Sequence, residues 1–205
     1  MRLIKTIFSW SLPVFIGLIV AYLIQLFILV PVTVNGDSMM DNLHNGQRIW
    51  VFKPAKIRRG SVVVFDARRE DPGIQAGEKD YVKRVIAVSG DEIRAENGLI
   101  YVNGHQINQN YISFYNRTTG TGDWDLKSLS SAGSLFVSGK SHWIDGNAVK
   151  VPNDCYFVLG DNRARSEDSR YFGFIDKKHV VGAALVFPWE KDRTAINSEW
   201  KHFYN

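Results

Sequence analysis

Ser38 is the first residue whose surroundings suggest covalent chemistry. It lies in the segment 34–39 (VNGDSM), directly after a long apolar run. A serine hydroxyl is a weak nucleophile until a neighbouring base takes its proton, so this serine needs a partner elsewhere in the chain. Gly36 would allow a tight bend just before it. An ordinary loop serine is the alternative interpretation of the segment.

Lys83 could be that partner, because it interrupts the apolar strand pattern of residues 81–88 (YVKRVIAV). Strand alternation sends Lys83 and Arg84 to opposite faces, so one of the two faces the interior. If that residue is Lys83, loss of solvation disfavours its charged form and lowers its pKa. A neutral lysine can then act as a general base. The alternative is a solvated lysine on an edge strand.

A third polar segment, residues 160–170 (GDNRARSEDSR), follows a predicted strand and is dense in charges and hydroxyls. It predicts either a solvated turn held by local Asp–Arg pairs or a network that orients a catalytic group. The five histidines show no His-x-x-x-His or His-Glu spacing, which gives zinc hydrolase chemistry little support. No Gly-x-Ser-x-Gly elbow surrounds Ser38.

The N-terminal segment is apolar enough to place these residues at a membrane. Arg2 and Lys5 are the only charged residues before Asp37. A bilayer core needs about 20 apolar residues, which residues 12–34 supply. The stretch exceeds a typical signal-peptide core, and no small-x-small cleavage site follows it. We therefore expect a cytoplasmic tail at residues 1–11, a retained transmembrane helix at 12–34 and an extracytoplasmic domain at 35–205.

The remainder of the chain predicts a mostly β fold, an antiparallel multi-sheet domain. Short runs rich in β-branched and aromatic residues, separated by Asn-Gly and Gly-Asp turns, indicate strands at 48–52, 61–65, 81–89, 99–102, 155–159 and 180–187, with a hairpin at 92–107. Residues 112–147 are rich in Ser, Thr, Gly and Asn and predict a loop-rich insertion with at most one short hairpin. Residues 190–205 predict a tail or a short helix, and helix content after residue 36 should be low.

Composition excludes several classes of protein. The 205 residues carry a net charge of +4, a surplus too small to indicate nucleic-acid binding. A single cysteine, Cys155, excludes a disulfide scaffold and a cysteine-based zinc site within one chain. No metal or organic cofactor is implied.

Three motifs in order give the chain a family resemblance. Residues 36–39 (GDSM), 81–85 (YVKRV) and 160–173 (GDNRARSEDSRYFG) follow an apolar anchor. In this the chain resembles the bacterial type I signal peptidases, membrane-anchored Ser–Lys proteases, in their compact Gram-positive style. The resemblance implies a membrane-bound serine endopeptidase that cleaves N-terminal signal peptides from exported preproteins. It implies Ser38 as the nucleophile and Lys83 as the general base.

The resemblance also implies roles for further residues of the site. Ser166 matches the hydroxyl that hydrogen-bonds and orients the lysine. Asp161, Asp168 and Arg170 match polar residues that hold the shape of the site. The backbone N–H of Ser38 would contribute to the oxyanion hole. The expected partners are secretory preproteins and the lipid bilayer, at the cell membrane and without nucleic acid.

Two positions depart from the family pattern. Asp41 stands where the family usually has Pro in Ser-Met-x-Pro, which removes a rigid turn residue and adds a charge near Ser38. Gly36 stands where some relatives carry a hydroxyl residue that helps the oxyanion. Two alternatives stay open: a membrane-tethered β domain that binds an export partner without catalysis, supported only by Asp41, and a self-cleaving Ser–Lys repressor protease. The latter family has a DNA-binding headpiece where this chain has its apolar segment.

Overall fold

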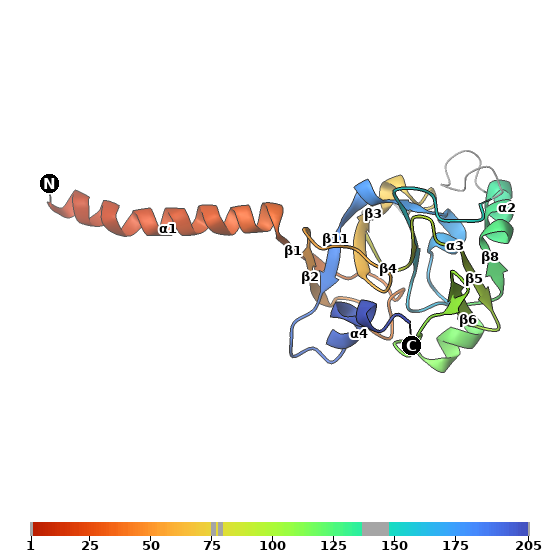
Figure 1. Cartoon of the computed structure of the whole chain (residues 1–205). Helices are drawn as coiled ribbons and strands as arrows, with labels where there is room; N and C mark the ends of the chain where they lie inside the picture. Colours follow the sequence, from red (N-terminus) through yellow and green to blue (C-terminus); the bar gives the residue numbers. More distant parts are fainter. Residues whose placement is uncertain (1, 75–76, 78–79, 137–147, 205) are drawn as a thin grey trace.

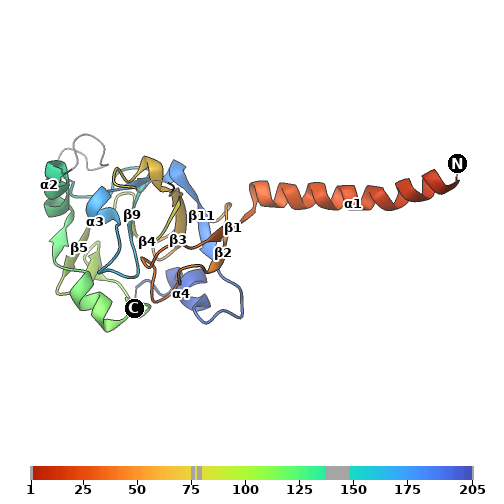
Figure 2. The same ribbon diagram turned by 180° about the vertical axis from the view of Figure 1, so that it is seen from behind.

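A long N-terminal helix projects from a β-rich domain (Figure 1). The computed structural model describes residues 2–74, 77, 80–136 and 148–204. Helix α1 (Arg2–Phe27) leaves the domain beside β1 (Leu29–Thr33), and Figure 2 shows the same arrangement from behind. Its window from Trp10 to Phe27 is apolar, exposed and long enough to cross a membrane. The predicted apolar helix is therefore present.

The boundaries expected for this segment were wrong. The helix begins at Arg2, inside the expected tail, and ends at Phe27 rather than at residue 34. Residues 29–33 (LVPVT) instead form β1, which pairs antiparallel with β2 (Arg48–Phe52). Valine and threonine favour a strand, and Pro31 is tolerated because β1 is an edge strand. The apolar segment 12–34 was assigned to one helix because its hydropathy does not distinguish the helix from the short strand that follows it.

Two antiparallel sheets make up the domain, which confirms the predicted fold class. The first sheet has the order β1-β2-β11-β3-β4-β9-β10 and the second the order β7-β6-β5-β8. Besides β1 and β2, their strands are β3 (Val62–Asp66), β4 (Asp80–Val88), β5 (Ile93–Glu96), β6 (Leu99–Val102), β7 (His105–Gln106), β8 (Trp124–Asp125), β9 (Cys155–Leu159), β10 (Ile175–Asp176) and β11 (Val180–Leu185). The smaller sheet lies at the end of the domain remote from α1 (Figures 1 and 2).

Strands β3 and β4 are buried on both faces. In β3, Val62 and Val64 pack in one apolar cluster, while Val63 and Phe65 pack in another. In the pairing with β4, Val63 lies opposite Lys83 and Val62 opposite Arg84. Lys83 and Arg84 therefore lie on opposite faces, as predicted, yet both are buried because both faces of the strand are covered.

The expected loop-rich insertion contains a helix. Within residues 112–147, β8 pairs with β5, and α2 (Leu126–Phe136) follows it directly. Asp125 and Ser128 exchange hydrogen bonds at the start of α2, in the manner of a capping box. That Asp-x-x-Ser pattern was the missed signal. The rest of the expected insertion, residues 137–147, lies outside the described residues.

Short helices complete the fold. They are η1 (Ala67–Arg69), the π-helical turn η2 (Asn116–Gly120), α3 (Ser169–Phe172), η3 (Lys177–His179), α4 (Arg193–Asn197) and η4 (Glu199–Lys201). The last two fall in the segment predicted to be a tail or a short helix. Ile196 of α4 packs into the apolar cluster that contains Val62 and Val64, so this end of the chain is part of the core.

Candidate active site

Ser38 and Lys83 are in direct contact although they lie 45 positions apart in the sequence. Lys83 Nζ donates to Ser38 Oγ at 2.8 Å. Ser38 lies in a turn after β1. The side chain of the next residue, Met39, is 1% exposed and anchors this turn in the apolar core. Lys83 projects from β4 and is 3% exposed, with its ammonium 4.8 Å from the centre of the Tyr81 ring. A serine hydroxyl beside a buried amine is an arrangement that can generate a nucleophile.

An open pocket of about 400 Å³ exposes this pair to solvent. Residues 32–38 and residues 80–83 line the pocket, together with Gly77, Arg165 and Glu167. Within the described residues, the N–H of Ser38 donates to no protein acceptor. This donor is therefore available to the oxygen of a ligand that binds beside Ser38.

Gly160 allows the loop after β9 to approach Ser38 closely. A Cβ at this position would lie 2.1 Å from Ser166 Oγ and 2.5 Å from the carbonyl oxygen of Ser38. The N–H of Asn162 donates to that same carbonyl at 3.0 Å. The glycine and the amide together fix the backbone that carries the serine.

Ser166 is brought to the site, but the hydrogen bond expected of it is not formed. Its side chain is 4% exposed, and its Oγ makes no hydrogen bond of normal geometry with the described residues, Lys83 included. It lies near Asp168, and this proximity contributes to a low pKa of that carboxyl. Its role in orienting Lys83 stays a prediction.

Asp161 forms a buried ion pair with Arg84, the residue that follows Lys83. Arg84 donates Nε to Asp161 Oδ1 at 2.8 Å and Nη2 to Oδ2 at 2.7 Å, and both side chains are fully buried. Burial lowers the pKa of Arg84, but Asp161 outweighs this effect and raises it. Asn42 Nδ2 also donates to Asp161 Oδ2, at 2.8 Å. The pair therefore ties β4 to the loop after β9 and to the turn that carries Ser38.

Asp168 and Arg170 form a second buried pair beside the site. Arg170 donates to both carboxylate oxygens of Asp168, at 2.8 and 2.9 Å. Burial raises the pKa of Asp168, but the Arg170 guanidinium and further hydrogen bonds hold it below its ordinary value. The N–H of Gly160 donates to Asp168 at 3.0 Å. These contacts are those of residues that hold the shape of the loop.

Three residues of this network are not among the predicted site residues. Arg84 was considered only as the alternative to Lys83 for the inward-facing position. Its place in an apolar strand was nevertheless a signal that its side chain needs a buried partner. Arg163 is 1% exposed and donates to the Gly160 carbonyl at 3.0 Å and to the Tyr111 hydroxyl at 3.0 Å. No local pattern identifies Asn42, because its partners are distant in sequence.

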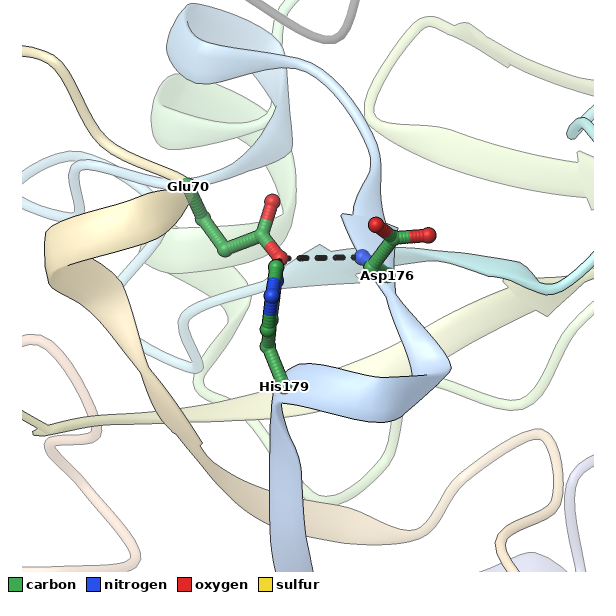
Figure 3. A group of neighbouring side chains, drawn as sticks. All are labelled: Glu70, Asp176 and His179. Carbon is green, nitrogen blue, oxygen red and sulfur yellow. Dashed lines mark hydrogen bonds and ion pairs between the residues drawn. The ribbon is translucent and has the colours of Figure 1, made fainter.

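Glu70, Asp176 and His179 are the described side chains whose ligand atoms gather closely enough for a metal ion, within 4.8 Å of one another (Figure 3). Nδ1 of His179 hydrogen-bonds directly to Glu70 Oε1, and the N–H of Asp176 donates to the same oxygen at 3.1 Å. The Asp176 carboxylate points away from both and pairs with Lys178 at 2.5 Å. Glu70, the residue after η1, is thus hydrogen-bonded to β10 and to η3, and none of the three residues lines the pocket at Ser38.

Comparisons with known proteins identify the family of the chain. The family model "Signal peptidase, peptidase S26" matches residues 7–189. Signal peptidase IB of Staphylococcus aureus strain COL is 34% identical, covering 98% of this chain and 96% of that protein. Signal peptidase I of Bacillus licheniformis is 32% identical, covering 92% and 93%. A solved structure of a signal peptidase I from Enterococcus faecalis V583 is 28% identical, with a TM-score of 0.48, and covers 63% of this chain and 97% of that one.

The family model and these relatives define the class of protein as a peptidase, a hydrolase that acts on peptide bonds. The chain belongs to the signal peptidase family, peptidase S26, whose members cleave signal peptides.

Proposed function

We propose that this chain is a membrane-bound serine endopeptidase that removes N-terminal signal peptides from exported preproteins, with Ser38 as nucleophile and Lys83 as general base. The observation that carries the proposal is the 2.8 Å contact between Ser38 Oγ and the Nζ of a lysine that is 3% exposed. An amine buried to this degree is favoured in its neutral form, which accepts a proton.

In the proposed reaction, Lys83 takes the proton of Ser38 while Oγ attacks the scissile carbonyl carbon. The N–H of Ser38 donates to the developing oxyanion. The lysine then gives its proton to the departing amine, which leaves an acyl-enzyme on Oγ. Water attacks this ester with Lys83 again as base, and the signal peptide is released as a carboxylate.

The pocket supports an extended substrate. Its lining includes residues 32–38, which are the end of edge strand β1 and the following turn. It also includes residues 80–83, the start of β4 before pairing with β9 begins at Arg84. Backbone groups at such edges can bind a peptide in strand conformation, with side chains pointing alternately into pockets. The family resemblance implies small residues, commonly Ala, at the first and third positions before the cut.

Helix α1 supports a membrane location. Its apolar window ends at Phe27, and only ten residues separate that position from Ser38. A preprotein whose own apolar segment lies in the same bilayer would be confined near Ser38, which raises its effective concentration. Arg2 and Lys5 favour a cytoplasmic N-terminus and an extracytoplasmic β domain.

Asp41 gives little support to the alternative of a binding module without catalysis. Its side chain is exposed, and it lies outside the residues that line the pocket. The charge that replaces the usual proline is therefore directed to solvent, and the Ser38–Lys83 contact is made in its presence.

The test is cleavage of a preprotein with an Ala-x-Ala site by the full chain in liposomes. We expect one cut after the second Ala, with activity lost in Ser38→Ala. Ser198→Ala is the matched control, because the Ser198 hydroxyl donates to Thr194 on α4 and lies outside the pocket. Retention of cleavage in Ser38→Ala would refute the proposal.

A further inference from the structure

Lys53 closes the junction between the apolar helix and the β domain. Its Nζ donates to the carbonyl of Leu26 in the last turn of α1 at 2.6 Å. Its N–H donates to the carbonyl of Ile28, the single residue between α1 and β1, at 2.9 Å. Lys53, the residue directly after β2, therefore contacts α1 through its side chain and the α1–β1 junction through its backbone.

The helix needs such a partner from outside. The last four carbonyls of a helix have no intrahelical donor, and their end of the helix carries partial negative charge. The last turn of α1 contains no basic residue. In the described part of the helix from residue 12 to residue 27, Lys53 is the one β-domain side chain that donates a hydrogen bond to it.

The Lys53–Leu26 hydrogen bond lies where the apolar helix would leave the membrane. If α1 spans the bilayer, the Leu26 carbonyl lies at the boundary of the hydrocarbon, where an unpaired polar group is costly. A lysine suits this place because its stem can lie along apolar surface while its ammonium stays near water. A charge-assisted hydrogen bond of this kind is among the stronger ones in proteins.

The angle at this junction sets the height of Ser38 above the membrane. Strand β1 directly follows the hinge and has five residues, so it is about 17 Å long at roughly 3.3 Å per residue. A pivot of about 20° at Ile28 would move its far end by about 6 Å, and Ser38 lies just beyond that end. A substrate held in the same bilayer would then meet Ser38 at the wrong height.

We propose that Lys53 is a positioning residue that couples the membrane helix to the peptidase domain and so adapts the site to membrane-inserted substrates. This inference rests on the proposed function for its substrate. It separates two classes of substrate: a preprotein held by its own apolar segment, which depends on the angle, and a short soluble peptide, which does not.

The experiment compares Lys53→Met with the wild type in liposomes on two substrates that share one Ala-x-Ala site. We expect KM for the membrane-inserted preprotein to rise about five- to tenfold, in the range of ordinary coupling between sites, with kcat unchanged. The soluble peptide should be cleaved at the wild-type rate. Lys53→Arg should restore KM, because it keeps a charged donor. Lys56→Met, at an exposed lysine three residues away, controls for lost attraction to anionic lipid.

A spectroscopic measurement reports on the hinge without any substrate. Spin labels on Leu18→Cys and Glu92→Cys, both at exposed positions, report the distance between α1 and the β domain, while native Cys155 is buried. Lys53→Met should broaden the distance distribution, and Lys53→Arg should not.

An unchanged distribution in Lys53→Met, or an equal loss on both substrates, would overturn the inference. If the wild type cleaves neither substrate, the proposed function fails, while the distance measurement still decides whether Lys53 fixes the helix.

Discussion

Removal of the Asp161 carboxylate should destabilise the fold far more than removal of an exposed aspartate. Asp161 accepts two hydrogen bonds from Arg84 and one from Asn42, and the Arg84 and Asp161 side chains are fully buried. Asp161→Ala leaves a guanidinium in the core without its counter-charge, which costs about 3–5 kcal/mol. That is a large share of the roughly 5–15 kcal/mol by which domains are stable.

Asp154 offers the matched control. Its side chain is 84% exposed and pairs with Lys177 at 3.2 Å, and asparagine tolerates the positive φ of 57° at this position, so Asp154→Asn should change stability by less than about 1 kcal/mol. The assay is urea unfolding of the full chain in detergent, followed by tryptophan fluorescence. In a double-mutant cycle, Arg84→Met should restore part of the stability lost in Asp161→Ala. Equal effects of Asp161→Ala and Asp154→Asn would refute the reasoning.

Three more predictions follow from individual contacts. Gly160→Ala should reduce preprotein cleavage about 100-fold, because the added Cβ would displace Ser166 or the backbone of Ser38. Gly17→Ala is the control, because a Cβ at Gly17 meets open space, and equal activities of the two variants would contradict the prediction. Burial raises the pKa of the Cys155 thiol to about 11, so alkylation at pH 8 should be about 100-fold slower in the folded chain than in urea, and equal rates would disprove it. The lowered pKa of Asp168 contributes stability that is present above its unfolded pKa and is lost as pH falls through its folded value. Asp168→Asn should therefore weaken the acid dependence of unfolding below the ordinary aspartate pKa of about 3.9, and an unchanged slope would argue against the pair.

Local patterns were enough to predict most of the β domain. The predicted strands at 48–52 and 155–159 match β2 and β9 without shift, because β-branched and aromatic runs between turn residues define them locally. The end of the apolar helix could not be predicted in this way. Residues 29–33 are as apolar as the helix before them, and only pairing with β2 makes them a strand.

The sequence predicted a site residue where a polar side chain interrupts an apolar strand pattern. Lys83 in an apolar strand was such a residue, and the structure places it against Ser38. Its neighbours were harder, because contacts made by folding specify them. Asn42 reaches Asp161 across 119 residues of sequence, and no spacing encodes that contact. The Ser166 hydroxyl is beside the site, yet it makes no hydrogen bond of normal geometry to Lys83 or to any other residue that the structure describes.

The most direct test of the Ser38–Lys83 pair is the pH dependence of preprotein cleavage. We would measure kcat/KM from pH 6 to 10 for the wild type, Ser38→Ala and Lys83→Met, with Lys127→Met at an exposed lysine as control. The wild type and the control should gain activity through a pKa well below the ordinary lysine value of about 10.4, and the two site variants should show no activity at any pH. A rise centred near 10, or the same profile in Lys83→Met, would contradict the account.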